Sequence, residues 1–102
     1  MNNDAFSKRK KRLEHIIIHR TAEFLNKEAG RRSLITVTAC HLNENITKAV
    51  IFLSVYPVED LGSALAFARR KARVINNYIK ETGNLDRVPK LEILPTEDSL
   101  TK

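Results

Sequence analysis

Residues 34–56, LITVTACHLNENITKAVIFLSVY, decide the fold of this chain. The stretches 34–42 and 48–56 are rich in β-branched residues, and the residues between them, 43–47, are polar. Two such stretches joined by a short polar link predict a β-hairpin. Because successive side chains of a strand point to opposite faces, the hairpin should bury one apolar row. That row is Ile35, Val37, Ala39, Ala49, Ile51, Leu53 and Val55.

A helix is predicted before the hairpin, over residues 7–29. Its core-facing positions follow helical spacing. They are Leu13, Ile16, Ile17, Thr21, Phe24 and Glu28, with Leu25 on the flank of the same face. Asp4 and Ser7 are both candidate N-caps, and Gly30 follows as a candidate left-handed residue that ends the helix.

A second long helix is predicted after the hairpin, over residues 59–82. Pro57 ends the preceding strand, and Gly83 is expected to close the helix as Gly30 closes the first. The apolar stripe recurs at alternating spacings of four and three residues, which keeps it on one face. It consists of Leu61, Leu65, Ala68, Ala72, Ile75 and Ile79.

A short third strand is predicted at residues 90–94, where side chains alternate before Pro95. The order helix, strand, strand, helix, strand predicts an α+β fold, in which a three-stranded sheet has two helices on one face and its other face open to solvent. We expect one domain over residues 1–102, with loose tails at about 1–6 and 96–102. Spacing alone leaves the order of the strands open.

Positive charge is concentrated in two segments of the chain. Of 102 residues, 18 are Lys or Arg and 12 are Asp or Glu, but residues 1–32 and 69–90 each carry +5, and the other two segments each carry −2. A polyanionic partner would bind to segments in which positive charge is concentrated in this way. A single cysteine excludes an intramolecular disulfide, and no apolar stretch reaches the roughly 18–20 residues of a membrane span. With no secretory signal visible, we expect a soluble protein of a reducing cytoplasm.

The basic residues are ordered on helix faces. If residues 59–82 form one straight helix, the stripe beside the apolar one holds Arg69, Arg73, Asn76 and Lys80, with Arg70 and Asn77 next to it. A merely solvated face would pair such cations with carboxylates at i±4, but no acidic residue lies between Arg69 and Lys80. Long cations and amides reach phosphates and ribose hydroxyls, so the pattern predicts contacts to an RNA backbone. The candidate RNA-binding residues are Lys8, Arg9, Lys11, Arg12, Arg69, Arg70, Arg73, Asn76, Asn77, Lys80 and Arg87.

The sequence gives less support for a metal site, a cofactor site or catalysis. His15 and His19 have metal-ligand spacing, and Cys40 precedes His41 on a strand, yet no zinc-binding pattern joins these residues. No glycine-rich phosphate loop is present, so we predict no metal, no cofactor and no enzyme activity. Cys40 is interpreted as a small core residue.

Three other kinds of binding stay open. Phe52 and Tyr56 alternate on the predicted open face of the sheet and would suit base stacking, whereas Phe67 and Tyr78 are assigned to helix flanks. The basic amphipathic first helix would also suit an anionic membrane, although its apolar face is needed to cover the sheet. A pure protein-interaction module is the remaining alternative.

The order of these elements and motifs resembles the ribosome-binding factor A family. Residues 30–57, GRRSLITVTACHLNENITKAVIFLSVYP, are similar to the family's hairpin, with a T-V-T-type first strand at 36–38, a polar turn at 43–46 and an A-x-V-type second strand at 49–51. Residues 87–99, RVPKLEILPTEDS, resemble its V-P-x-L-x-F strand and Asp-x-Ser-like end. The basic opening KRKKRLEHIIIHRTAEFL, residues 8–25, is similar to its first helix.

This resemblance implies a type II KH-like fold in a monomeric, cytoplasmic protein that binds the small (30S) ribosomal subunit late in assembly. It further implies support of the processing and folding of the 5′ end of 16S rRNA. Family members carry an Ala-x-Gly kink in the second helix, and here the aligned residues 71–73 contain no glycine, so a straighter helix is an alternative. The family's frequent C-terminal extension is almost absent. The alternative function is a protein-interaction module or another RNA- or DNA-binding KH-like domain that does not act on the ribosome.

Overall fold

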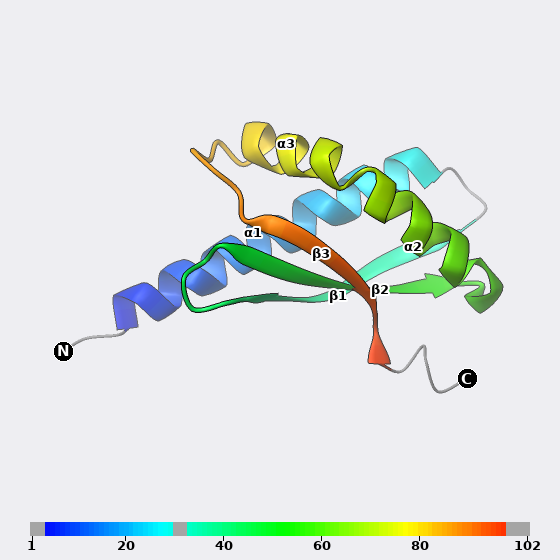
Figure 1. Ribbon diagram of the computed structural model, residues 1–102, viewed down its shortest axis with the longest axis horizontal. Helices are drawn as coiled ribbons and strands as arrows, with labels where there is room; N and C mark the ends of the chain where they lie inside the picture. The colour runs from blue at the N-terminus through cyan, green and yellow to red at the C-terminus, as the bar shows by residue number, and fades with distance from the viewer. Residues whose placement is uncertain (1–3, 30–32, 98–102) are drawn as a thin grey trace.

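The computed structural model of the protein describes residues 4–29 and 33–97 (Figure 1). The elements follow in the order α1 (Asp4–Ala29), β1 (Leu34–Leu42), β2 (Lys48–Tyr56), a 3₁₀ turn (Val58–Asp60), α2 (Leu61–Arg70), α3 (Ala72–Thr82) and β3 (Lys90–Pro95). The predicted α+β fold and all three predicted strands are confirmed.

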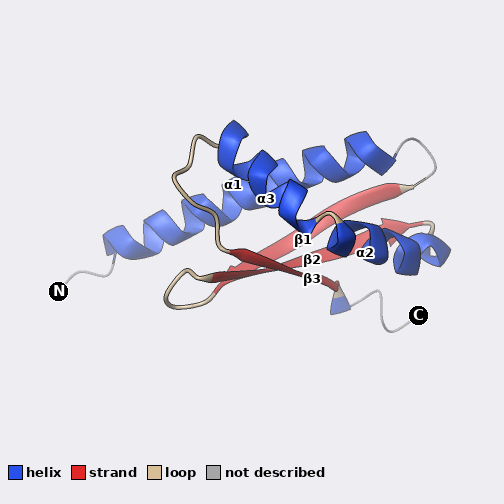
Figure 2. Ribbon diagram, turned by 45° about the horizontal axis from the view of Figure 1, so that its top comes forward, coloured by secondary structure: helices blue, strands red, loops and turns tan. Residues whose placement is uncertain are grey.

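The strands form one mixed sheet in the order β1-β2-β3. β1 and β2 pair antiparallel as the predicted hairpin, and β2 and β3 pair parallel, with Lys48 opposite Lys90. A parallel pair needs a long crossover connection, which α2 and α3 supply. The helices α1, α2 and α3 cover one face of the sheet, as predicted, and within residues 4–29 and 33–97 none of them covers the other face (Figure 2).

A β-bulge in β1 changes the predicted core row. Val37 pairs with Leu53 and Ala39 pairs with Phe52, so Thr38 is an extra residue on β1. One extra residue moves every following side chain to the opposite face. The prediction that Ala39 belongs to the core row is therefore wrong: Ala39 is half-buried on the open face, and Cys40 is buried in the core, as we interpreted it.

The core lies between the helices and the covered face of the sheet. The largest side chains buried completely come from α1, β2 and α3, and they are Ile17, Leu25, Ile51, Leu53, Ile75 and Ile79, together with Thr21. Leu65 and Ala68 of α2 are also buried, while Leu61 and Ala72 of the predicted stripe are half-buried at its margin. The periodic patterns therefore located the packing faces of both helical segments.

The prediction of one helix over residues 59–82 is wrong, because the helix breaks at Lys71. Lys71 has φ −97° and ψ 11°, and its N–H donates to the carbonyl oxygens of both Phe67 (3.1 Å) and Ala68 (3.2 Å). The break lets α2 pack on β2 and β3 while α3 packs against α1 and β3. The two helices consequently run in different directions across the sheet (Figure 1). The straighter helix that the lack of a glycine at residues 71–73 allowed is therefore not found.

The residue that ends α3 also differs from the prediction. Gly83 has an ordinary right-handed conformation (φ −88°), and the following Asn84 takes the left-handed one (φ 55°). Asn84 and Leu85 donate their N–H groups to the carbonyl oxygens of Glu81 (3.3 Å) and Lys80 (2.9 Å), which is the Schellman pattern. Gly83 is needed for a different reason, since a Cβ there would lie 2.8 Å from the backbone carbonyl oxygen of Ile79 and 3.0 Å from the Ile16 side chain of α1. Gly30 lies outside the described residues.

Side chains of the helices bind the outer edges of the sheet. Asn26 of α1 accepts the N–H of Ile35 (3.1 Å) and donates to its carbonyl (2.8 Å), and Glu14 accepts the N–H of Leu42 (3.3 Å). At the opposite edge, Arg69 Nε of α2 donates to the carbonyl of Ile93 in β3 (2.9 Å). These bonds satisfy outward-facing backbone groups and fix each helix against one edge strand.

A polar cluster on the outer side of the core joins α1 to α3. The Tyr78 hydroxyl donates to Glu23 (2.9 Å), which also accepts a hydrogen bond from Arg20 (3.1 Å), and the Tyr78 ring packs on Phe24 at 5.6 Å. The Arg20 and Tyr78 donors lower the pKa of Glu23, and donation to that carboxylate raises the pKa of Tyr78. Tyr78 therefore sits on a helix flank, as predicted.

The first and last described residues belong to the folded domain. Residues 4–6, which we assigned to a loose tail, belong to α1. Thr96, at the start of the other predicted tail, donates its N–H to the Leu53 carbonyl (2.7 Å). Residues 1–3 and 98–102 lie outside the described residues.

Candidate nucleic-acid interface

The first group of predicted contacts lies on the N-terminal half of α1. Lys8, Arg9, Lys11 and Arg12 are all exposed. The first turns of α1 extend beyond the end of the sheet, which leaves this part of the helix free of the covering elements (Figures 1 and 2). A ridge of cations that projects from the domain is accessible to a phosphate backbone from several sides.

The second group surrounds a groove along β3, the edge strand of the sheet. Two adjoining depressions of about 490 and 290 Å³ share Ala72, Lys90 and Leu91, and together we call them the edge groove. Cations from four different elements line it. These are Lys48 of β2, Arg69 and Arg73 of the two helices, and Lys90 of β3. The break at Lys71 brings the start of α3 to this groove, because Ala72 lies in its wall.

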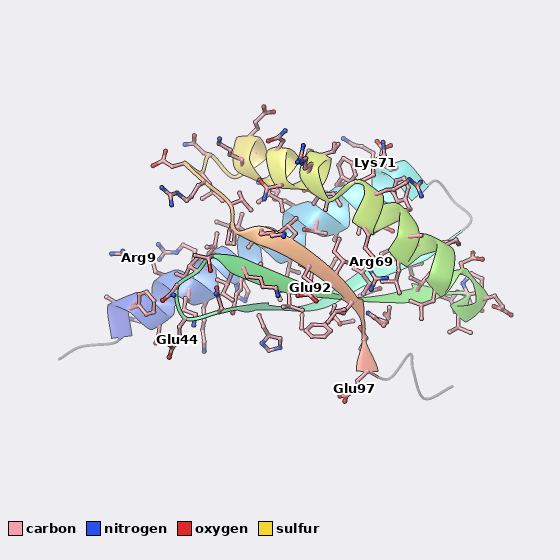
Figure 3. All side chains as sticks on the ribbon, in the orientation of Figure 1. Arg9, Glu44, Arg69, Lys71, Glu92 and Glu97 are labelled. Atoms are coloured by element: carbon pink, nitrogen blue, oxygen red, sulfur yellow. The ribbon has the colours of Figure 1, made fainter. Side chains whose placement is uncertain are left out.

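The break also separates Arg69 and Arg70 from the stripe that a straight helix would have formed. Arg69 crosses to β3, where its Nε donates to Ile93, and it lies beside Glu92 (Figure 3). Arg70 instead places its guanidinium 5.7 Å from the centre of the Phe67 ring. Both side chains are exposed, so their remaining donors face solvent.

On α3, the predicted residues divide into free and engaged side chains. Arg73, Asn77 and Lys80 are exposed. Asn76 is half-buried and its amide donates to the carbonyl oxygens of Pro89 (3.0 Å) and Val88 (3.4 Å). Asn76 therefore anchors the loop that precedes β3.

Arg87 lies in the loop between α3 and β3 and is exposed. This loop and the first turns of α1 lie at the same end of the molecule in both ribbon views (Figures 1 and 2). The loop between α3 and β3 therefore lies at the end where the basic segment of α1 projects, although the two segments are far apart in the sequence.

Among the described residues, Lys48 is the one cation of the candidate interface that takes part in an ion pair. Within residues 4–29 and 33–97, the ion pairs are Arg20–Glu23 (3.1 Å) and Lys48–Glu92 (2.8 Å), and none of the eleven predicted contact residues takes part in one. The hydrogen bond from Lys48 lowers the pKa of Glu92, and the charges of Arg69 and Lys90 act in the same direction. Glu92 is thus one carboxylate among several cations.

Lys48 and Lys90 were missed by the sequence analysis. Both residues belong to predicted strands. The alternation of apolar and polar residues in those strands predicted which side chains share a face, but not which strands are neighbours. The two lysines meet because β2 and β3 are parallel neighbours with Lys48 opposite Lys90, and this register is not contained in the spacing of either strand. The one sign of this pairing in the sequence is that each of the two strands begins with a lysine.

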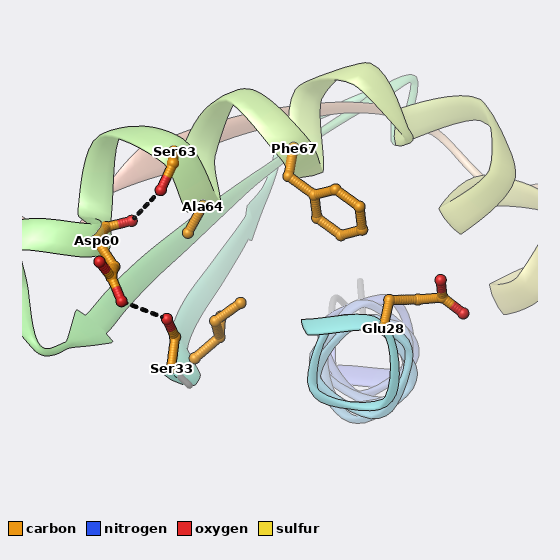
Figure 4. Close-up of a pocket in the computed structure, with 7 residues that line it drawn as sticks. Glu28, Ser33, Asp60, Ser63, Ala64 and Phe67 are labelled. Carbon is orange, nitrogen blue, oxygen red and sulfur yellow. Dashed lines mark hydrogen bonds between the residues drawn. The ribbon is translucent and has the colours of Figure 1, made fainter. Parts of the chain in front are cut away.

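A smaller cavity of about 280 Å³ lies between the end of α1, the start of β1 and α2 (Figure 4). The Ser33 hydroxyl donates to the Asp60 carboxylate (2.6 Å), and the Ser63 hydroxyl donates to the Asp60 carbonyl (3.2 Å). Its charged lining residues are Glu28 and Asp60. These groups tie β1 to α2 and offer nothing to a phosphate.

The histidines and the cysteine do not assemble into a site. Over the described part of the chain, no group of three or more His, Cys, Asp or Glu side chains is placed to hold a metal ion. His15 and His19 are exposed on α1, while Cys40 is buried in the core. Burial raises the pKa of the Cys40 thiol to about 12, and the nearby Glu14 charge adds to this rise.

The buried thiol should be unreactive in the folded protein. Because only the thiolate attacks alkylating reagents, we expect iodoacetamide at pH 8 to modify Cys40 roughly tenfold or more slowly in the native protein than in denaturant. The folded state retains the proton that an unfolded thiol loses near pH 9.0, so this contribution to stability is present below pH 9.0 and is lost as the pH rises towards 12. Mass spectrometry of timed samples measures the rate, and equal rates in both states would contradict the burial of Cys40.

Comparison with known proteins gives structural matches. No protein-family model matches the chain, and no curated protein matches it in sequence. The crystal structure of ribosome-binding factor A from Thermus thermophilus is 24% identical, with a TM-score of 0.70 over 84% of this chain and 93% of that chain. A homology model of the Thermus thermophilus factor, fitted into a cryo-EM map of its complex with 30S, is 26% identical, with a TM-score of 0.71 over 85% of this chain and 94% of that one.

The chain has the fold of ribosome-binding factor A. The resemblance drawn from residues 30–57 and 87–99 is thereby confirmed in three dimensions, since the match covers most of both chains. The matched proteins are described as ribosome-binding factors.

Proposed function

We propose that the protein binds the small ribosomal subunit through rRNA, with the edge groove and the basic half of α1 as its contact surfaces. The observation that carries this proposal is the edge groove itself, where Arg69, Arg73 and Lys90 from three elements converge without ion pairs among the described residues. Such a groove suits a sugar–phosphate strand, because the cations can contact successive phosphates. The structural match to a factor seen in complex with 30S supports the same partner.

The role we propose is one of binding rather than catalysis. The protein would support folding and 5′-end processing of 16S rRNA by holding RNA in the immature subunit, as the resemblance to the family implies. It would act as a single-domain monomer in the cytoplasm, where subunits are assembled. No helix in the described ranges is both long and apolar enough to cross a membrane.

Sedimentation through a sucrose gradient tests the proposed partner. Mixed with purified bacterial 30S, 50S and 70S particles, the protein is expected to migrate with 30S. In a cell lysate it should accompany free small subunits rather than translating ribosomes. A protein that binds short RNA but stays at the top of the gradient in the presence of 30S would instead be an RNA-binding domain that does not act on the ribosome.

A further inference from the structure

The bare face of the sheet carries a hollow that the proposed phosphate contacts do not use. It has a volume of about 530 Å³, within the roughly 300–1,000 Å³ range of small-ligand sites. Its lining comes from all three strands and from the residues after β3. The lining residues are Thr38, Ala39, His41, Phe52, Leu94, Pro95, Thr96 and Glu97.

The register of the sheet explains why this hollow exists. Ala39, Phe52 and Leu94 lie directly beside one another across β1, β2 and β3. The bulge at Thr38 puts the small Ala39, rather than a larger side chain, next to the Phe52 ring. Space is therefore left on one side of an aromatic ring that is itself only half-buried.

Polar groups stand around this aromatic floor. The Thr38 and Thr96 hydroxyls share a hydrogen bond of 2.6 Å, and Thr38 also donates to the Phe52 carbonyl (3.3 Å), so the rim is held in place. The His41 ring lies 5.6 Å from the Phe52 ring at 82°, so the two rings are not stacked on one another. An apolar floor with a few fixed hydrogen-bonding groups is the usual make-up of a site for a flat, polar-edged ring.

Charge divides the two neighbouring surfaces. Among the described residues, no Lys or Arg lines the hollow, and its carboxylate, Glu97, would repel a phosphate. The edge groove on the other side of Leu94 contains Lys48, Arg69 and Lys90. Leu94 lines both surfaces, so they adjoin. If the phosphates of an RNA lie in the edge groove, the hollow next to that groove offers the RNA a site without cations.

We propose that this hollow binds one unpaired nucleobase of the RNA whose backbone lies in the edge groove. The base would stack on Phe52 and present its polar edge to Thr38, His41 and Thr96. This inference rests on the proposed function, because the phosphates in the edge groove bring the base to the hollow. It adds a stacking contact to a surface otherwise built from charges.

The test measures binding of short single-stranded RNA to the full chain. Fluorescence anisotropy gives the affinity across a range of salt concentrations, and the same RNA with one 2-aminopurine reports stacking by its quenching. Phe52→Ala is expected to weaken binding about tenfold, since a stacked base contributes about 1–3 kcal/mol. The salt dependence should stay unchanged because the phosphate contacts remain. Phe52→Tyr should retain both the affinity and the quenching.

Two further variants serve as controls for Phe52→Ala. Tyr56 is an exposed aromatic residue of the same strand and face but outside the hollow, so Tyr56→Ala should bind like the unchanged protein. If Phe52→Ala does not fold, Phe52→Leu keeps an apolar side chain in the sheet and should show the same loss of quenching.

The outcomes separate this inference from the proposed function. If the unchanged protein binds RNA and Phe52→Ala and Phe52→Leu bind it equally well with equal quenching, the base site is disproved and RNA binding stands. If Phe52→Ala keeps RNA affinity but no longer migrates with 30S, the face docks on a protein of the subunit and the base site is again disproved. If the unchanged protein binds neither RNA nor 30S, both proposals fail.

Discussion

Replacing Arg73 and Lys90 by alanine is expected to weaken RNA binding about 30-fold at about 0.1 M salt, because each removed phosphate contact lowers the slope of log K against log salt by about 0.7–0.9. Both side chains line the edge groove, are exposed and take part in neither of the ion pairs among the described residues. The slope should accordingly fall by about 1.4–1.8. Affinity for a short single-stranded RNA, measured over a series of salt concentrations, provides both numbers.

The matched control for this variant is Arg20→Ala with Lys27→Ala. It removes the same net charge from α1, at positions that line no part of the edge groove and that surround the Tyr78–Glu23 cluster instead. If binding depends only on overall positive charge, both double variants will lose affinity to the same extent. That result would argue against the edge groove as the contact surface while leaving the fold assignment intact.

Truncation of Ile75 should have the largest effect on stability. Ile75 is completely buried in α3, where it packs into the core between the helices and the sheet. Ile75→Ala is expected to lower the free energy of unfolding by about 2–5 kcal/mol, because the removed methyl and methylene groups leave a cavity. Urea denaturation followed by circular dichroism measures the change.

The neighbouring residue supplies the control for Ile75. Val74 precedes it in α3 and is 48% exposed, so Val74→Ala removes a similar side chain from the solvent side. Its effect should stay within about 0.5 kcal/mol. Helix propensity favours alanine at both positions, so two equal losses would mean that burial does not distinguish the two side chains, which would contradict the placement of Ile75 in the core.

Periodicity predicted those parts of the fold that a single element determines. The rows Ile51–Leu53 and Ile75–Ile79 could be assigned to the core because alternation and helical spacing are properties of one strand or one helix. The bulge at Thr38 could not be predicted, since the pattern before and after it is equally alternating. Because of the bulge, the Cys40 side chain rather than that of Ala39 faces the core.

The features that needed tertiary contacts were the ones missed. Lys71 and Ala72 are good helix formers, so nothing local predicts a break between them. α2 packs on the sheet and α3 on α1, and a straight helix would not follow both surfaces. The candidate site shows the same limit: Arg73 was found from its helix, whereas Lys90 depended on the parallel register, and Asn76 proved to hold the loop before β3.

The hydrogen bonds at the two sheet edges bear on how the molecule behaves at high concentration. A further strand could pair with β1 only by displacing Asn26 from Ile35 and Glu14 from Leu42. On β3, Arg69 occupies the carbonyl of Ile93, and Pro95 has no N–H to offer. Each edge thus resists the templated addition of a neighbouring polypeptide, which is the first step of edge-to-edge aggregation. These few side chains therefore protect a small protein from pairing with other chains at high concentration.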